Sequence, residues 1–190
     1  MKKDTLLART GRQPAHHQGM VNTPVFRTST VIFPDLETYE ARGGDNFKKM
    51  RYGLYGTPTT FAFEEAVAQM EGGHAAVALP SGLAAIAMAL WAYVKSGDHL
   101  LVPDSVYGPT RTFCERRLRP SGIETEYYDP LAGAGIARLL RDNTRAVFCE
   151  SPGSLSFEMQ DIPAIAEAAH RRGIPLLADT TWGTPYYFRS

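Results

Sequence analysis

The sequence predicts an α/β fold in which helices cover both faces of a mostly parallel sheet. Apolar strand-like runs and helical runs alternate between residues 75 and 179, and Gly or Pro residues mark most of the joints between them. This alternation indicates βαβ units, whose strands run parallel. The strand-like runs are short and continuously apolar, which is typical of strands buried on both faces.

Residues 1–50 are predicted to form an N-terminal arm without a core element. The segment is irregular up to about Asn46, is rich in Thr, Pro, Gly and His, and contains only short apolar pieces such as residues 31–34. Arms of this kind often pack on a partner subunit. The second predicted unit, residues 51–190, contains the sheet.

The first regular helix is predicted after Thr57. This residue can cap the helix and Pro58 suits its first turn, and the apolar residues that follow recur at helical spacing. Gly72 and Gly73 end the pattern, as glycines commonly do at the C-termini of helices.

The remaining elements follow from the alternation of strands and helices. Strands are predicted over residues 75–79, 99–102, 123–128, 146–150 and 174–179. Helices are predicted over residues 83–94, 107–118, 136–141 and 161–171.

The composition is that of an ordinary globular protein. The chain has 190 residues, of which 44% are hydrophobic and 21% charged, and this length is enough for one domain with a sizeable core. Its 20 basic and 20 acidic residues give no net charge, and solvated helix faces explain its arginine pairs, so we expect no nucleic-acid partner. No run approaches the ~18 apolar residues of a membrane span, so we expect no membrane partner.

Cysteine and histidine usage limits the chemistry further. Cys114 and Cys149 form no CxxC motif and lie far apart in the sequence. A disulfide framework is therefore not expected, and a reducing compartment, the cytoplasm, is predicted. The His16-His17 pair has no third ligand at a useful spacing, so no metal site is predicted.

A carboxylate closes the last predicted strand. Asp179 would lie at the carboxyl edge of the sheet, where open α/β sheets bind ligands. An acid at this place can pair with the protonated ring nitrogen of pyridoxal phosphate (PLP), whereas a structural Asp at a strand end commonly caps a helix or a turn. Thr181 could contact a ring substituent or a phosphate, and Trp182 could pack behind it. Taken alone, Asp179 fits both interpretations.

A possible phosphate cradle joins the first predicted strand to its helix. Ser81 can cap the helix, Gly82 allows a ligand close to the backbone, and the free N–H groups of the first turn can bind an anion. Ser-Gly is also a common strand-to-helix turn, and by itself this is the commoner explanation. The segment matches neither GxGxxG nor GxxxxGK[ST], so neither dinucleotide nor P-loop binding is supported.

Other polar segments lie at the same predicted edge or near it. Tyr107 could stack on a planar ring or pack at the rim of its helix. Residues 150–154, which include Ser154, offer hydroxyls and amides to a small polar substrate, or form an ordinary turn. Tyr52 lies between glycines before the first helix, where its hydroxyl could bind phosphate or belong to an ordinary loop. Polar segments on successive strand ends together predict a cofactor site.

The order of these segments resembles the Cys/Met-metabolism (trans-sulfuration) family of PLP enzymes, from about Thr5 to Tyr187. The matching segments are specific as a set. They are Tyr52-Gly53, Gly56-Thr57-Pro58-Thr59, Glu71-Gly72-Gly73, Ser81-Gly82-Leu83-Ala84-Ala85, Tyr107-Gly108-Pro109, Asp129-Pro130, Glu150-Ser151-Pro152-Gly153-Ser154, Asp161-Ile162-Pro163-Ala164-Ile165 and Asp179-Thr180-Thr181-Trp182.

The resemblance implies a fold and a cofactor. The fold would be the large domain of a fold-type I PLP-dependent transferase-like enzyme, truncated, with the small C-terminal domain absent. The cofactor would be PLP. Its binding residues would be Tyr52, Ser81, Gly82, Leu83, Tyr107, Asp179 and Thr181.

The resemblance also implies individual roles. Tyr107 would stack on the cofactor ring and take part in proton transfer, and Asp179 would pair with the ring nitrogen. Ser154 would contact the amino-acid substrate. Tyr52 would reach across a dimer interface to the phosphate of the neighbouring subunit, which implies a homo-oligomer, in this family usually a tetramer built from dimers.

The activity implied is that of a carbon–sulfur lyase in trans-sulfuration and methionine biosynthesis. Its reaction would be β-elimination of cystathionine to homocysteine, pyruvate and ammonia. Relatives that catalyse γ-elimination, γ-replacement or homoserine sulfhydrylation remain an alternative. The run of residues 150–154 favours the β-eliminating branch, because γ-acting relatives tend to carry Asn near its end.

The chain departs from the family pattern in two places. Leu54 stands where the family often has an arginine for the phosphate. The lysine that forms a Schiff base with PLP would follow Asp179 by a few tens of residues, and none of Lys2, Lys3, Lys48, Lys49 and Lys95 has that context. We therefore expect this chain alone to be inactive, and a non-catalytic fragment is a further hypothesis.

Overall fold

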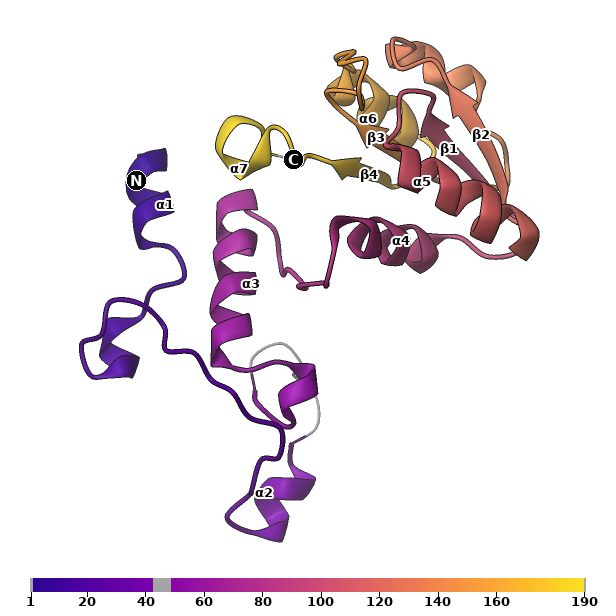
Figure 1. Ribbon diagram of the computed structural model, residues 1–190. Helices are drawn as coiled ribbons and strands as arrows, with labels where there is room; N and C mark the ends of the chain where they lie inside the picture. Colours follow the sequence, from indigo (N-terminus) through magenta and orange to yellow (C-terminus); the bar gives the residue numbers. More distant parts are fainter. Residues whose placement is uncertain (1, 43–48, 190) are drawn as a thin grey trace. The chain divides into compact units, whose positions relative to one another are not determined.

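The computed structural model describes residues 2–42 and 49–189. The chain divides into two compact units, one of residues 1–78 and 185–189 and the other of residues 79–184, and Figure 1 shows the path of the chain through them. Asn46, where the irregular segment is predicted to end, lies outside the described residues, as do Lys48 and Ser190. The predicted domain boundary after residue 50 stays a prediction.

The first unit contains short helices in the segment predicted to be irregular, so that prediction is wrong for these residues. The cause is local. Asp35 caps one of the helices by accepting a hydrogen bond from the backbone of Thr38 at 2.7 Å, which also lowers the pKa of its carboxyl group. Asp4 and Arg9 lie at the N- and C-terminal turns of another, where their charges suit the helix dipole. The elements are α1 (Lys3–Arg9), the 3-10 turn η1 (Pro14–His17) and α2 (Leu36–Glu40).

The helix predicted after Thr57 is confirmed as α3 (Pro58–Glu71), which follows the 3-10 turn η2 (Gly53–Tyr55). Pro58 is its first residue, and Gly72 ends it in the left-handed conformation with φ 70°. Thr57 occupies the N-cap position, but its side chain makes no capping hydrogen bond, so that detail of the prediction is wrong.

The second unit contains a four-stranded sheet in the order β2-β1-β3-β4, with parallel pairing throughout. This confirms the predicted parallel sheet, and each of the four strands overlaps a predicted strand. At the carboxyl edge, Glu150 and Asp179 are partners in the register of the last pair. The strands are β1 (His99–Pro103), β2 (Glu124–Tyr128), β3 (Thr144–Glu150) and β4 (Leu176–Asp179).

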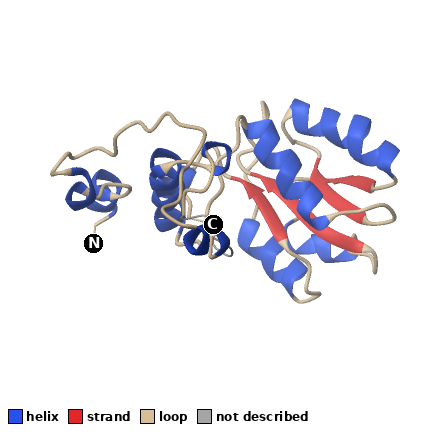
Figure 2. Ribbon diagram, turned by 90° about the horizontal axis from the view of Figure 1, so that it is seen from below, coloured by secondary structure: helices blue, strands red, loops and turns tan. Residues whose placement is uncertain are grey.

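Helices cover both faces of this sheet, as predicted, and Figure 2 shows them on either side of the strands. Side chains alternate along β1, so Leu100 belongs to the buried cluster on one face and Leu101 to the cluster on the other. Full burial of one such leucine stabilises the fold by about 2 kcal/mol. One face carries α4 (Gly82–Tyr93), α5 (Gly108–Phe113) and the π-helical turn η3 (Cys114–Leu118); the other carries the 3-10 helix η5 (Gly133–Arg138) and α6 (Ile162–His170).

Three predicted elements differ in the structure. The helix predicted over residues 107–118 is divided between α5 and the π-helical turn η3. Residues 75–79 pair with no strand among the described residues, because a strand forms only where a neighbour supplies hydrogen bonds, and Val77 is 58% exposed. The helix predicted over residues 136–141 is η5, which begins and ends earlier and is 3-10 rather than α-helical. Gly133 and Gly135 within it disfavour an α-helix. The chain also forms the short turns η4 (Arg119–Ser121) and α7 (Thr184–Tyr187).

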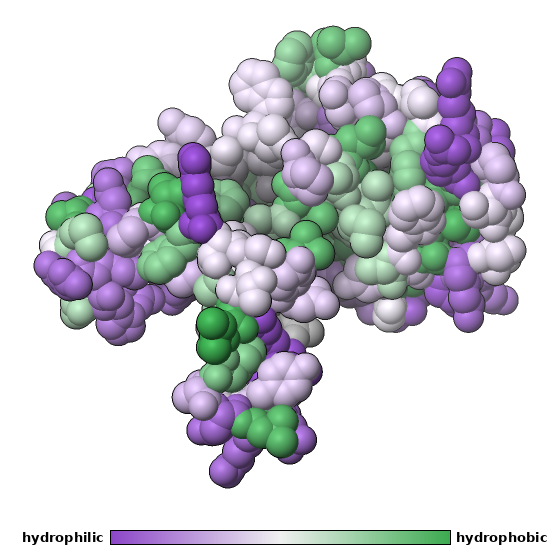
Figure 3. Space-filling view, turned by 60° about the horizontal axis from the view of Figure 1, so that its bottom comes forward, coloured by the Kyte–Doolittle hydropathy of each residue, from purple (hydrophilic) through white to green (hydrophobic). Residues whose placement is uncertain are grey.

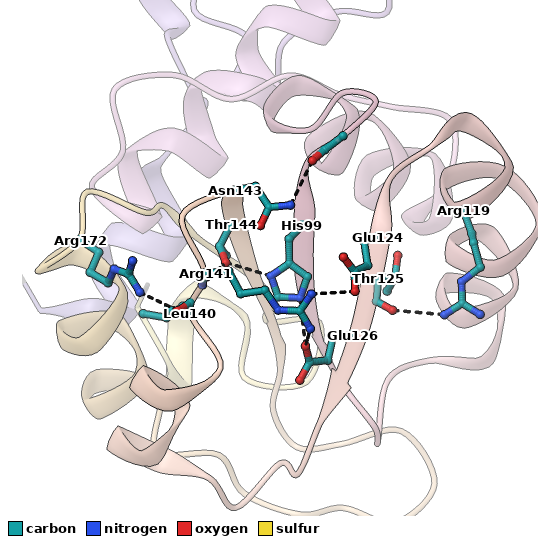
Figure 4. Close-up of polar contacts among 11 residues, drawn as sticks. His99, Arg119, Glu124, Thr125, Glu126, Leu140, Arg141, Asn143, Thr144 and Arg172 are labelled. Carbon is teal, nitrogen blue, oxygen red and sulfur yellow. Dashed lines mark hydrogen bonds and ion pairs between the residues drawn. The ribbon is translucent and has the colours of Figure 1, made fainter.

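A buried polar cluster lies at the amino end of the sheet (Figure 4). His99 is fully buried, with Nδ1 2.9 Å from Thr144 Oγ1, and its Nε2 lies 3.2 Å from Glu126 Oε2 without hydrogen-bond geometry. Arg141 forms ion pairs with Glu124 and Glu126. Burial lowers the pKa of His99, and the charge of Arg141 lowers it further, against the opposing charges of Glu126 and Glu124. The cluster therefore favours a neutral imidazole.

Hydrophobic side chains also reach the surface, and green residues appear at several places in Figure 3. Val25 and Ile32 are exposed in the first unit, and Met88 and Leu155 in the second. Within residues 2–42 and 49–189, no helix has both the length and the apolar character needed to cross a bilayer.

Candidate active site

A pocket of about 560 Å³ opens at the carboxyl edge of the sheet in the second unit. Its walls come from the loops after β1, β3 and β4 and from the N-terminus of α4. It brings together all the predicted site residues of this unit, which are Ser81, Gly82, Leu83, Tyr107, Ser154, Asp179 and Thr181.

The N-terminus of α4 forms one wall of the pocket. Ser81 caps the helix by accepting a hydrogen bond from Ala84 N at 3.1 Å, as the sequence predicts. The N–H groups of Gly82 and Leu83 belong to the first turn and have no partner inside the helix. A Cβ added to Gly82 would meet no atom within 4 Å, so the space beside the Gly82 Cα is open. This wall is suited to an anion such as a phosphate.

Tyr107 lies in the loop after β1, immediately before α5. Its side chain is 44% exposed and lines the pocket. Its backbone N–H donates a hydrogen bond to Glu150 Oε2 at 2.8 Å, which ties this loop to the end of β3. An exposed ring held at the edge of a pocket can stack on a planar ligand.

Glu150 is a pocket residue to which the sequence argument assigned no role of its own. It closes β3 beside Asp179 of β4 and is largely buried. Burial raises the pKa of its carboxyl group and the charge of Asp179 raises it further, while the hydrogen bond from Tyr107 acts in the opposite direction. The sequence feature that could have identified Glu150 is its position, since it is an acidic residue at the end of an apolar strand.

Asp179 makes the cap contact that the sequence left open, and its pairing with a ring nitrogen stays a prediction. Its Oδ1 accepts a hydrogen bond from Thr181 N at 2.9 Å, so it caps the turn after β4. It also lines the pocket together with Thr181. Trp182 packs edge-on against Phe157, with ring centroids 5.7 Å apart. The capped turn holds the carboxylate in place before any ligand binds.

The loop after β3 forms the remaining wall. Ser154 N donates to Ser105 O at 2.8 Å, which joins this loop to the one after β1. A Cβ at Gly153 would lie 2.6 Å from Ser105 Oγ, so the approach of the two loops requires glycine. Leu155 and Phe157 adopt the left-handed region, with φ of 66° and 61°. Such conformations are uncommon for large side chains and gather at functional sites.

Tyr52 belongs to the first unit and is not part of this pocket. Its side chain is partly exposed, and Leu54 beside it is 82% exposed. Arg51 Nε and Nη2 are buried and have no hydrogen-bond partner among the described residues. The cross-subunit role of Tyr52 stays a prediction.

The two cysteines lie outside the pocket. Cys114 and Cys149 are both free and buried, and burial raises the pKa of each thiol to about 11. Within the described part of the chain, no cluster of three His, Cys, Asp or Glu side chains could hold a metal ion.

The pocket residues fit PLP. The first-turn N–H groups suit its phosphate, the exposed Tyr107 ring suits its pyridine, and the fixed Asp179 carboxylate suits its protonated nitrogen. A parallel sheet with this pocket at its carboxyl edge defines the large domain of a fold-type I PLP-dependent enzyme.

Known proteins support this class and narrow it to a family. The cystathionine γ-lyase of Lactobacillus plantarum, solved with L-serine, has a TM-score of 0.87 and 28% identity, covering 98% of this chain and 46% of that chain. The model of the family "Cys/Met metabolism PLP-dependent enzyme" matches residues 4–190. The chain belongs to this family, and membership implies PLP as the cofactor.

Several relatives share the family. A Rhizobium johnstonii protein provisionally named a cystathionine β-lyase is 49% identical over 98% of this chain and 46% of its own length. The cystathionine β-lyase of Escherichia coli is 37% identical over 100% of this chain and 49% of its own. An L-methionine γ-lyase of Porphyromonas gingivalis and an L-alanine/L-glutamate racemase of Wolbachia pipientis are 32% and 33% identical, each over 100% of this chain and 49% of its own. The chain spans about half the length of these relatives.

Proposed function

We propose that the chain forms the cofactor-binding part of a carbon–sulfur lyase that converts cystathionine to homocysteine, pyruvate and ammonia by β-elimination. One observation carries the proposal: a single pocket contains the α4 N-terminus, Tyr107 and Asp179. The names of the Rhizobium johnstonii and Escherichia coli relatives support the choice of reaction.

Each pocket residue then has a defined task. PLP, when bound, supplies the electron-withdrawing ring that makes the α-proton of an amino acid acidic. The N–H groups of Gly82 and Leu83 bind the phosphate, and Asp179 keeps the proton on the ring nitrogen. Tyr107 packs on the ring and moves a proton through its hydroxyl. Ser154 contacts the substrate from the loop after β3.

Elimination at the γ-carbon is a second candidate function. The Porphyromonas gingivalis relative is named a γ-lyase, and so is the solved Lactobacillus plantarum structure. The pocket residues described above bind the cofactor in either reaction, so the products must separate the two.

The products of cystathionine breakdown test the proposal. A full-length enzyme that contains this chain, given PLP and cystathionine, is expected to release pyruvate and homocysteine, whereas this chain alone is expected to be inactive. Release of 2-oxobutanoate and cysteine would instead identify γ-elimination. Absence of both sets of products from a protein that binds PLP would favour the non-catalytic reading of this chain.

The proposal extends to assembly and location. We propose a homo-oligomer, a tetramer built from dimers, in which Tyr52 binds the phosphate of the neighbouring subunit. The partly exposed Tyr52 and the apolar side chains at the surface support this arrangement. A cytoplasmic location is proposed from the two free cysteines.

A further inference from the structure

We propose that Glu150 is a positioning residue of the candidate site: it fixes the backbone of Tyr107 from the end of β3 and places a second negative charge beside Asp179. The proposal rests on the proposed PLP-binding function, because it names the group that sets the geometry and the charge of that site.

Glu150 is itself held firmly. Its backbone oxygen accepts a hydrogen bond from Gln160 Nε2 at 2.8 Å, and Gln160 is buried. Gln160 Oε1 lies 2.9 Å from the hydroxyl of Tyr128, which is buried on β2. The end of β3 is therefore anchored to buried neighbours, and the Glu150 side chain projects from a rigid base.

The side chain of Glu150 controls the loop that carries Tyr107. Its Oε2 accepts the Tyr107 N–H at 2.8 Å. This N–H stands before the first turn of α5, while the Tyr107 carbonyl accepts from Arg111 N at 3.1 Å. The backbone of Tyr107 is thus bonded on one side to the helix and on the other to β3. Without the carboxylate, the Tyr107 N–H loses its acceptor and only the Tyr107 carbonyl stays bonded, to the helix, so the position of the ring becomes less fixed.

The negative charge of Glu150 lies next to that of Asp179, in another wall of the pocket. Glu150 and Asp179 are register partners on neighbouring parallel strands, and both line the pocket. The titratable groups that line the pocket with Glu150 are Tyr107 and Asp179, so among the described residues no cationic side chain lines the pocket to offset the two carboxylates. Two carboxylates hold a proton on a ring nitrogen more firmly than one does.

The hydrogen bond can be measured without any cofactor. The amide proton of Tyr107 donates to a carboxylate, so its chemical shift is expected to change when Glu150 is protonated. The midpoint is expected above the ordinary glutamate pKa of 4.5, because burial raises the pKa of this group. Glu150→Gln should abolish the titration but keep an acceptor, and Glu150→Ala should also increase the rate of amide exchange. Glu167→Gln, an exposed residue of α6, should change neither readout.

Measurement of the affinity for a cofactor analogue tests the role of the Glu150 charge. The probe is pyridoxamine phosphate, which carries the ring and phosphate of PLP but no aldehyde that reacts with lysines. Glu150→Gln is expected to weaken its binding several-fold, with a loss that shrinks at low pH as the wild-type carboxyl protonates. Glu150→Ala is expected to weaken it about tenfold, which corresponds to about 1.4 kcal/mol, because this variant removes both the charge and the acceptor of the Tyr107 N–H.

The outcomes separate this inference from the proposed function. A Tyr107 amide that does not titrate, or a Glu150→Gln protein that binds the probe as tightly as wild type, would overturn the inference. If wild-type protein does not bind the probe at all, the proposed function fails, and the charge role fails with it; the amide titration alone then decides the backbone contact. Should Glu150→Ala not fold, Glu150→Gln still decides both parts.

Discussion

Asp179 shows how one carboxylate can both cap a turn and line a candidate site. Its Oδ1 caps the turn at Thr181 while the side chain lines the pocket. The sequence predicted the position and the residue type, but could not choose between a cap and a ligand contact. Glu150 escaped assignment for a related reason: only the fold shows that its side chain meets the Tyr107 backbone, 43 residues earlier.

Replacement of the Asp179 carboxylate tests its role at the ring nitrogen. Asp179→Asn keeps an oxygen that can accept from Thr181 but removes the charge. Affinity for pyridoxamine phosphate should fall about tenfold or more, because hydrogen bonds to charged groups contribute roughly 1.5–3 kcal/mol. Fluorescence titration measures this.

Asp129→Asn is a matched control for that experiment. Asp129 follows β2 at the same edge and caps its turn in the same way, by accepting from Leu131 N at 2.8 Å, but it does not line the pocket. Its replacement should leave the affinity unchanged. Equal losses in the two variants would contradict the role of Asp179.

At the scale of elements, local patterns predicted the sheet unit well. Each of β1 to β4 lies within a predicted strand or overlaps one, although β2 carries Glu124 and Glu126, and both faces of the sheet are covered as expected. The apolar run at residues 75–79 was also predicted as a strand but forms no strand, because strand formation depends on a partner that the run itself does not encode. A helix cap depends on residues close by in the sequence, whereas a strand needs a distant partner. The cap at Ser81 was therefore predicted correctly.

Loss of the Ser81 hydroxyl should destabilise α4. Ser81→Ala removes the hydrogen bond to Ala84 N and is expected to cost about 1 kcal/mol of unfolding free energy. Urea unfolding measures the change. Ser81→Thr keeps a hydroxyl and should cost less, so equal losses in both variants would show that the cap is not the cause.

Burial of His99, the first residue of β1, should make the free energy of unfolding depend on pH. The pKa of folded His99 is lowered from 6.5, so the unfolded chain binds its proton more readily. The free energy of unfolding should be highest above about pH 6.5 and should fall as the pH drops below that value. His99→Gln should remove this part of the pH dependence in urea unfolding.

His170→Gln provides the comparison for His99, because His170 lies exposed at the end of α6. Its replacement should leave the pH dependence as in wild type. An unchanged slope in His99→Gln would show that the imidazole is not held neutral.

At the scale of the whole molecule, exposed apolar side chains indicate association. Large hydrophobic residues are exposed in both units, including Ile32 and Leu155, and the net charge is zero, which does not oppose association. The sequence predicted an oligomer from its family resemblance, but could not show which side chains remain uncovered.

Light scattering during size-exclusion chromatography tests this expectation. The mass in solution should exceed the 20.9 kDa of one chain. A single species at the monomer mass would contradict the proposed oligomer.

We propose that the pocket at the carboxyl edge of the sheet binds PLP. The most direct test is a map of amide chemical-shift changes on addition of pyridoxamine phosphate. The largest changes are expected at Gly82 and Leu83, at Tyr107, and at Asp179 and Thr181. Saturating changes confined to residues outside this pocket, or no changes at millimolar probe, would contradict it.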